Sequence, residues 1–316
     1  SKHHFIAWLC LVVGGCQTLP APVVSPTTAP VRFLLTFDDG PSADRYFNTT
    51  LDILAQLESN DVQPDIKALF FVQTRHQTGG GTKLGRAIMR YQHGTGHVLG
   101  LHSGTDRGHI RHTAMAADEL AQSLRDGQDD LRAITERDTV FIRPTFWGYN
   151  DQTRGLYDIH GLKMLLTDVN NRDGSIVNSV FGLRERVRLE LLRARRAIER
   201  EVLPQWQGSI PLVITLHDLN PVTALRMTNY LHILVEEARV VGLPLADKPF
   251  YDDATDIIAV ASLRAVPPQP VTFTAQSSRP NSSAVVKQLA FAEQPGTRMG
   301  PTPTLQNPDA SAPVLR

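Results

Sequence analysis

Carboxylate and imidazole side chains stand directly after several short apolar runs of the sequence. Asp38 and Asp39 follow one run, His102 follows another, and His217 follows a third. Both cysteines lie in the first sixteen residues, so a metal held by the rest of the chain has no thiolate ligand. Histidine and carboxylate ligands that leave open positions for water and substrate are typical of a divalent ion used in hydrolysis. The pattern therefore predicts a metal-assisted hydrolytic site.

The same residues include the proton-transfer groups that hydrolysis needs. If Asp39, His102 and a second histidine bind the ion, Asp38 is left as a general base toward water. His217, on the opposite side of the site, would then protonate the leaving group. A Lewis acid between a base and an acid is the minimum arrangement for cleaving an amide.

The elements that position these residues alternate along the chain. Apolar runs typical of buried strands alternate with segments of helical spacing, which predicts parallel strands joined by crossover helices. Polar residues after the carboxyl ends of such strands meet at one edge of the sheet, where ligands bind. The predicted strands are 32–37, 68–72, 97–101, 140–142, 163–166 and 212–216, and the predicted helices are 46–59, 83–91, 115–134, 183–202 and 224–241.

Five motifs in this order resemble the signatures of the NodB-type polysaccharide deacetylases, carbohydrate esterase family 4. The most specific is Thr-Phe-Asp-Asp-Gly-Pro-Ser at 36–42. The other four are Gly-His-Val-Leu-Gly-Leu-His-Ser at 96–103, Arg-Pro-Thr-Phe-Trp at 143–147, Asp-Val-Asn-Asn-Arg-Asp at 168–173, and Leu-His-Asp at 216–218. The resemblance implies a distorted (β/α) barrel with fewer than eight regular strands. It also implies a divalent metal, usually zinc.

The activity implied by the resemblance is hydrolytic removal of N-acetyl groups from a GlcNAc-containing polysaccharide of the cell envelope. Asp38 would be the base, oriented by Arg143, and His217 the acid, its pKa tuned by Asp173. The backbone N–H of Phe146 would help to hold the oxyanion. Two alternatives stay open: a hydrolase of the same fold acting on O-acetyl esters or small cyclic amides, and a catalytically degenerate glycan-binding protein.

By the same resemblance, Asp39 and His102 bind the metal, and Trp147 and Leu216 line the pocket around the acetyl methyl group. The sequence departs from the family in two places. The family's second histidine follows the first by four residues, a position that Asp106 occupies here.

A three-residue insertion would restore the match through His109, which we favour as the third ligand over Asp106 and, more weakly, His112. The fourth motif is followed by Gly174 where the family usually carries tryptophan, so one wall of the pocket is expected to be more open.

The ends of the chain predict export and anchoring. A basic start, an apolar stretch at 5–13 and Gly-Gly-Cys at 14–16 are typical of a secretory signal and resemble a lipobox with Cys16 as the lipidated residue. An ordinary signal peptide is the alternative. The residue after Cys16 is Gln17 and not the Asp that typically retains a lipoprotein in the inner membrane. This favours the outer membrane if the host is Gram-negative. We expect a Pro/Thr-rich tether at 17–31, the catalytic domain at 32–262 and a disordered tail at 263–316.

The charge balance excludes one class of partner. The chain has 316 residues, with 32 Lys and Arg against 32 Asp and Glu, which gives no net positive field to attract nucleic acid. The expected partners are an acetylated amino-sugar polymer and, through the lipid anchor, a membrane.

Overall fold

The computed structural model describes residues 29–268. The predicted signal peptide with Cys16, most of the tether, and the tail from residue 269 onward lie outside the described residues. Among the helices of the described part, none is both long and apolar enough to cross a membrane.

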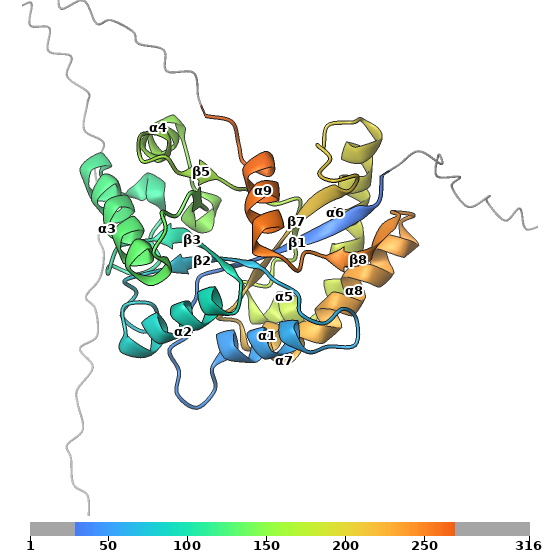
Figure 1. The fold of residues 1–316 in the computed structure, drawn as a ribbon, viewed down its shortest axis with the longest axis horizontal. Coiled ribbons are helices and arrows are strands. Elements are labelled where there is room, and N and C mark those ends of the chain that lie inside the picture. The colour runs from blue at the N-terminus through green and yellow to red at the C-terminus, as the bar shows by residue number, and fades with distance from the viewer. Residues whose placement is uncertain (1–28, 269–316) are drawn as a thin grey trace, which may run out of the picture. The chain divides into compact units, whose positions relative to one another are not determined.

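A parallel sheet forms the centre of the domain, as the alternation of strands and helices predicts (Figure 1). Seven strands follow one another in the order β5-β4-β3-β2-β1-β7-β6, and β8 pairs with β1 off this path. This curled, incomplete barrel confirms the predicted distorted (β/α) barrel. The strands are β1 (Val31–Asp38), β2 (Leu69–Gln73), β3 (Val98–Ser103), β4 (Phe141–Ile142), β5 (Lys163–Met164), β6 (Val169–Asn170), β7 (Ile210–His217) and β8 (Leu245–Phe250).

Helices connect most of the successive strands and cover the outside of the sheet. Figure 1 shows α3 and α4 on one side of the domain, α6 and α8 on the other, and α1 beside α7. The α-helices are α1 (Thr49–Glu58), α2 (Lys83–Gly94), α3 (Ala117–Thr135), α4 (Asp151–Ile159), α5 (Ile176–Val180), α6 (Leu183–Glu199), α7 (Pro221–Leu225), α8 (Met227–Val240) and α9 (Ala254–Arg264). Two 3₁₀ turns, η1 (His112–Ala114) and η2 (Thr145–Trp147), complete the described chain.

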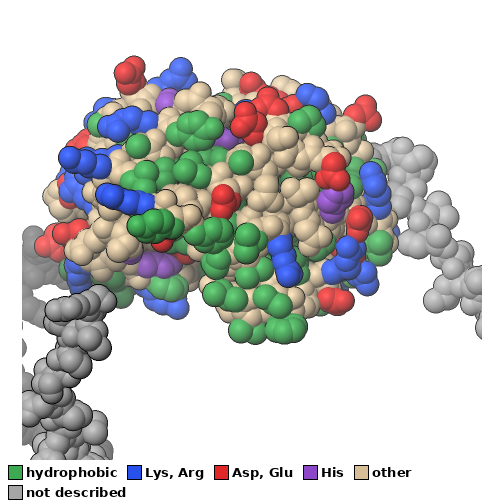
Figure 2. All heavy atoms as spheres, turned by 90° about the horizontal axis from the view of Figure 1, so that it is seen from below, with side chains coloured by type: hydrophobic (Ala, Val, Ile, Leu, Met, Phe, Trp, Pro, Cys, Tyr) green, Lys and Arg blue, Asp and Glu red, His purple; other side chains and the backbone are tan. Residues whose placement is uncertain are grey.

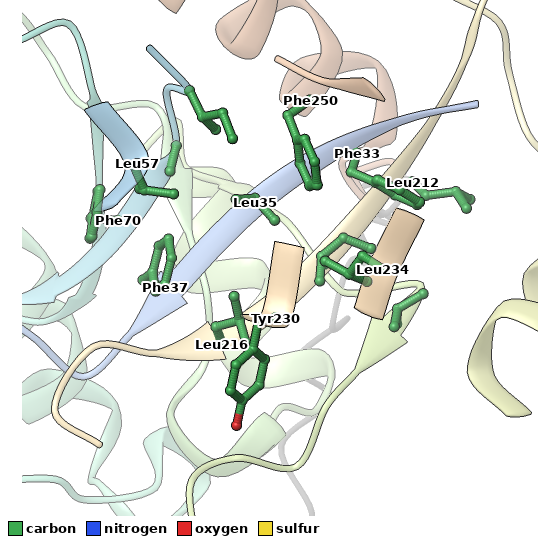
Figure 3. Close-up of a cluster of buried hydrophobic side chains, with 14 of the residues drawn as sticks. Phe33, Leu35, Phe37, Leu57, Phe70, Leu212, Leu216, Tyr230, Leu234 and Phe250 are labelled. Carbon is green, nitrogen blue, oxygen red and sulfur yellow. The ribbon is translucent and has the colours of Figure 1, made fainter. Parts of the chain in front are cut away.

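Alternating residues of each strand face two different hydrophobic layers, because successive side chains of a strand point to opposite faces. Phe33, Leu35 and Phe37 of β1 belong to the larger cluster, which includes residues of the surrounding helices (Figure 3). Leu34 belongs to a second cluster that includes Ile257 of α9. Helix α9 therefore packs on the inner side of the sheet, opposite the layer of crossover helices.

The structure refines several predicted boundaries. The first helix begins at Thr49 and not at residue 46, because Asn48 caps it by accepting a hydrogen bond from the backbone N–H of Leu51. The single helix predicted at 224–241 is two helices that change direction at Arg226. Helix α9, which the hydrophobic periodicity does not predict, ends at Arg264, two residues past the expected domain boundary.

Charged side chains of both signs are interspersed on the face seen in Figure 2. Blue and red side chains lie side by side there, and hydrophobic side chains gather between them. This face accordingly carries no broad surface of a single sign of charge.

Candidate metal and catalytic site

The central strand carries the first two site residues to the carboxyl edge of the sheet. Asp38 is the last residue of β1 and is paired in register with His217 at the end of β7. Asp39 follows with a φ of 82°, a left-handed conformation that redirects the chain immediately after the strand. The two adjacent carboxylates therefore point in different directions and have different partners.

One carboxylate and two imidazoles converge on a single point. Asp39 Oδ1 lies 3.2 Å from His102 Nε2 and 3.2 Å from His109 Nε2, and the two Nε2 atoms are 3.3 Å apart. Asp39 Oδ1 is buried and accepts no hydrogen bond with good geometry. His102 Nδ1 lies 2.8 Å from the backbone oxygen of Arg143, so this nitrogen carries the proton and the Nε2 lone pair faces the cluster.

This arrangement fits a divalent metal ion. Ligand atoms about 2.0–2.1 Å from one tetrahedral ion lie about 3.3 Å from one another, which matches all three separations. A buried carboxylate oxygen that accepts no hydrogen bond, together with two imidazole nitrogens that meet beside it, is a set of atoms that a bound cation would satisfy. The set of Asp39, His102 and His109 is also the only His/Cys/Asp/Glu group with metal-binding spacing in the described part of the chain.

Of the three residues considered for the third ligand, the structure brings only His109 to the cluster. Burial lowers the pKa of His109, which keeps its imidazole neutral and able to bind a cation. His112 instead lies buried beneath the site, with Nδ1 2.6 Å from the hydroxyl of Tyr157 and Nε2 3.0 Å from the backbone oxygen of His102. Asp106 does not belong to the group.

Asp38 is held by a fully buried arginine, as the resemblance implies. Arg143 Nη1 donates to Asp38 Oδ1 at 2.9 Å and to the hydroxyl of Thr36 at 2.6 Å. Its other nitrogens donate to the backbone oxygens of Leu165 and Leu166 at 3.1 and 3.3 Å. Burial lowers the pKa of Arg143, although the neighbouring carboxylate opposes this effect. With the guanidinium fixed on four acceptors, Asp38 has one defined orientation toward the pocket.

His217 is paired with Asp173 on the other side of the pocket. His217 Nδ1 lies 2.8 Å from Asp173 Oδ1, and the second carboxylate oxygen accepts the backbone N–H of His217 at 3.0 Å. Burial acts to lower the pKa of His217, but the hydrogen bond and charge of Asp173, together with the charges of Asp38 and Asp39, outweigh it and raise the pKa to about 9. A pKa in this range favours the protonated, proton-donating form of His217 at neutral pH in the metal-free protein.

A cavity of about 330 Å³ brings these groups together. Phe146 and Trp147 both line it with left-handed backbone conformations, φ 53° and 57°, which are strained for large side chains. Gly174 forms part of the wall, and a Cβ there would lie 3.2 Å from His217 Nε2. The lining consists of Asp38, Asp39, His102, His109, Arg111, Pro144, Phe146, Trp147, Gly174 and His217.

Leu216 does not line this cavity. It is fully buried with Leu212 and Ile214 in the helix-facing layer. Figure 3 shows Leu212 and Leu216 in this cluster. Because side chains alternate along a strand, Leu216 points away from the side that His217 faces. The lining of the cavity therefore gives no support to the predicted contact of Leu216 with the acetyl methyl group, which stays a prediction.

Three residues of the site were not singled out from the sequence. Thr36 shares Arg143 with Asp38, and Arg111 lines the pocket two residues after His109. Asp218 is buried beside the backbone of Gly40 and accepts a hydrogen bond from the Thr50 hydroxyl at 2.8 Å; burial raises its pKa to about 7. The sequence signal for Asp218 was its position next to His217 in the Leu-His-Asp motif at 216–218.

Residues 26–165 match the family model of the polysaccharide deacetylases. Solved structures agree with this match at the level of the fold. The chain is similar to the Xyl-CE4 domain of a multidomain xylanase from the hindgut metagenome of Trinervitermes trinervoides, with 21% identity, a TM-score of 0.51, and coverage of 76% of this chain and 93% of that one. It is also similar to the chitin deacetylase of Colletotrichum lindemuthianum, with 18% identity, a TM-score of 0.50, and coverage of 70% and 86%. Among curated proteins, none matches.

Proposed function

We propose that this chain is a metal-dependent hydrolase that removes N-acetyl groups from an acetylated amino-sugar polymer of the cell envelope. One observation carries the proposal. A single pocket contains an Asp–His–His group of metal-binding spacing, with the Arg143-bound carboxylate of Asp38 on one side and the imidazole of His217, paired with Asp173, on the other. The deacetylase family match at 26–165 supports the same reaction class.

The donor set suits zinc, which when bound acts as a Lewis acid toward the acetyl carbonyl. Asp39, His102 and His109 would hold the ion. Asp38, oriented by Arg143, would take the proton from the attacking water.

His217 would give its proton to the amine nitrogen as the carbon–nitrogen bond breaks. Asp173 keeps the imidazole ring oriented and protonated for that step. The backbone N–H of Phe146, on the strained turn of η2, is the candidate donor to the developing oxyanion.

A second candidate activity is hydrolysis of O-acetyl esters, which the open wall at Gly174 favours. Glycine leaves the space beside His217 free, so the pocket admits sugar substituents that a larger side chain would exclude. The leaving oxygen of an ester is less basic than an amine nitrogen. Ester cleavage would therefore depend less on the proton from His217.

The deciding experiment measures acetate release from N-acetylated glucosamine oligomers and from acetylated xylan, with added zinc and with a chelator. Chelator-sensitive release from the amino sugar, abolished in Asp38→Asn, supports the N-deacetylase. Release from xylan alone supports the esterase. No release from either substrate by zinc-loaded protein, together with retained glycan binding, identifies a glycan-binding protein instead.

We also propose that the chain is exported and anchored through a lipid on Cys16, in the outer membrane of a Gram-negative host. The order of the basic, apolar and Gly-Gly-Cys segments supports this. Labelled palmitate should be incorporated into the wild type, but not into Cys16→Ala. Equal labelling of the two proteins would rule the anchor out.

A further inference from the structure

We infer that Arg111 makes the pocket selective for glycans that carry a carboxylate close to the acetyl group. The inference rests on the proposed deacetylase function and specifies its substrate class. The arginine lies between β3 and η1, on the same loop as the metal-site residue His109, and lines the catalytic cavity. The resemblance to known deacetylases assigns it no role.

Arg111 is held in a defined place above the metal site. Its guanidinium carbon lies 5.1 Å from the centre of the Phe146 ring, and Nη1 donates to the Phe146 backbone oxygen at 3.4 Å. The Phe146 ring is itself stacked on His109, with ring centres 4.1 Å apart and planes 20° apart. A stack of guanidinium, phenyl ring and imidazole therefore fixes the arginine relative to the proposed metal.

The charge of Arg111 is not neutralised by the protein, in contrast to the other charged groups of the pocket. Asp38 is paired with Arg143, and His217 with Asp173. Asp39 belongs to the metal group. None of the ion pairs between described residues includes Arg111. A cation at the rim of a substrate pocket, without an acidic partner, is available to an anion on the substrate.

The geometry of a stacked guanidinium favours a carboxylate as that anion. Arginine has five N–H donors in one plane, and stacking on Phe146 leaves the edge of the plane accessible. One weak hydrogen bond to the Phe146 carbonyl leaves enough donors for a two-point contact with a planar carboxylate. A neutral N-acetylglucosamine chain offers no group that satisfies this charge. A uronic acid beside the acetylated sugar, or an acidic ether on that sugar, does.

A matched pair of substrates tests the inference. Acidic N-acetylated oligosaccharides are compared with the same molecules after chemical reduction of each carboxyl group to a primary alcohol, using zinc-loaded protein. We expect the wild type to prefer the acidic form in kcat/KM by about fivefold to tenfold at low ionic strength, mainly through KM. The preference should fall as salt is added, because the contact is exposed.

Arg111→Gln should remove the preference by raising KM for the acidic substrate alone. Arg107→Gln is the matched control, because Arg107 lies on the same loop but pairs with Glu119 outside the cavity and should keep the preference. The inference is overturned if the wild type does not discriminate, or if Arg111→Gln lowers kcat/KM equally for both substrates. The second result would mean that Arg111 only positions Phe146.

The outcome can be separated from a failure of the proposed function. If neither substrate releases acetate, the proposed deacetylase reaction fails, and selectivity is measured from dissociation constants by calorimetry. Tighter binding of the acidic form by the wild type, lost in Arg111→Gln, still supports the inference. Equal binding of both forms by the wild type overturns it.

Discussion

Replacement of Asp173 by asparagine tests the assignment of His217 as the proton donor. The substitution keeps the shape of the side chain but removes its charge. Asp173 is fully buried, and its carboxylate contacts His217 Nδ1 at 2.8 Å, the His217 backbone N–H at 3.0 Å and the Thr223 hydroxyl at 2.7 Å. The substitution therefore acts mainly on the imidazole of His217, and the other contact of the carboxylate is the one with the Thr223 hydroxyl.

The magnitude follows from the pKa of His217. Its rise from 6.5 to about 9, against the opposing effect of burial, corresponds to about 3.4 kcal/mol of preference for the imidazolium. Asp173 is the strongest contributor to the rise. In Asp173→Asn we expect the pKa to fall by about two units. At pH 8 the protonated fraction then drops from about nine-tenths to about one-tenth, and kcat falls about tenfold.

The assay is the pH profile of kcat for zinc-loaded protein, combined with NMR titration of the His217 ring in metal-free protein. A raised histidine pKa means that the acid form is present at low pH and is lost as pH rises through about 9. A bound dication repels the imidazolium, so the alkaline limb of the loaded enzyme should lie at or below that value. In Asp173→Asn this limb should move to lower pH, with metal content unchanged.

Asp168→Asn provides the matched control. Asp168 lies on the same segment, accepts the Val213 backbone N–H at 2.8 Å and pairs with Arg264, outside the cavity. Its substitution should lower stability without moving the alkaline limb. The reasoning is refuted if Asp173→Asn keeps the wild-type limb and the wild-type His217 pKa.

Three further changes test the other parts of the site. Asp38→Asn should lower kcat by about 10²–10⁴-fold while zinc still binds at one equivalent, measured by acetate release and metal analysis; loss of the metal instead would assign Asp38 to the ligand set. His109→Ala should weaken zinc binding measured by competition with a chromophoric chelator, whereas Asp106→Ala should not; the reverse order would overturn the ligand assignment. Gly174→Ala should lower kcat several-fold, because the added Cβ lies 3.2 Å from His217 Nε2, and an unchanged kcat would show that the ring can move aside without cost.

Much of the fold was predictable because the apolar runs of the sequence coincide with the strands that a parallel sheet buries on both faces. Apolar runs bounded by turns mark β1, β2, β3 and β7, which are buried on both faces and have no alternation of polar residues. Strand β6 and helix α5 were missed because a two-residue strand and a five-residue helix are too short to show any periodicity. Helix α9 shows no clear periodicity because apolar residues such as Ile258 and Leu263 also stand at its exposed positions, so the helix lacks a polar side.

The site was predictable where it follows strand ends and less so where it depends on loops or strand faces. The carboxyl ends of β1, β3 and β7 place Asp38, His102 and His217 at one edge, as parallel strands require. The sequence favours His109 as the third ligand but does not exclude Asp106 or His112, because sequence spacing does not give the path of a lengthened loop. A motif does not show which face of a strand a residue occupies, and side-chain alternation along β7 places Leu216 opposite His217.

Two of the proposed metal ligands lie on or next to strands of the sheet and the third lies on a loop, and this difference affects the rate at which the metal is released. Asp39 directly follows β1, which pairs with β2, β7 and β8 and is the most extensively bonded strand of the sheet, and His102 belongs to β3. His109, in contrast, belongs to the connection between β3 and η1 and is half-buried. Amide hydrogens of β1 should exchange with solvent only on global unfolding, whereas those near His109 should exchange through local opening. The rate of zinc dissociation should therefore follow the opening of this one loop, and bound zinc should slow amide exchange there while leaving the exchange of β1 nearly unchanged.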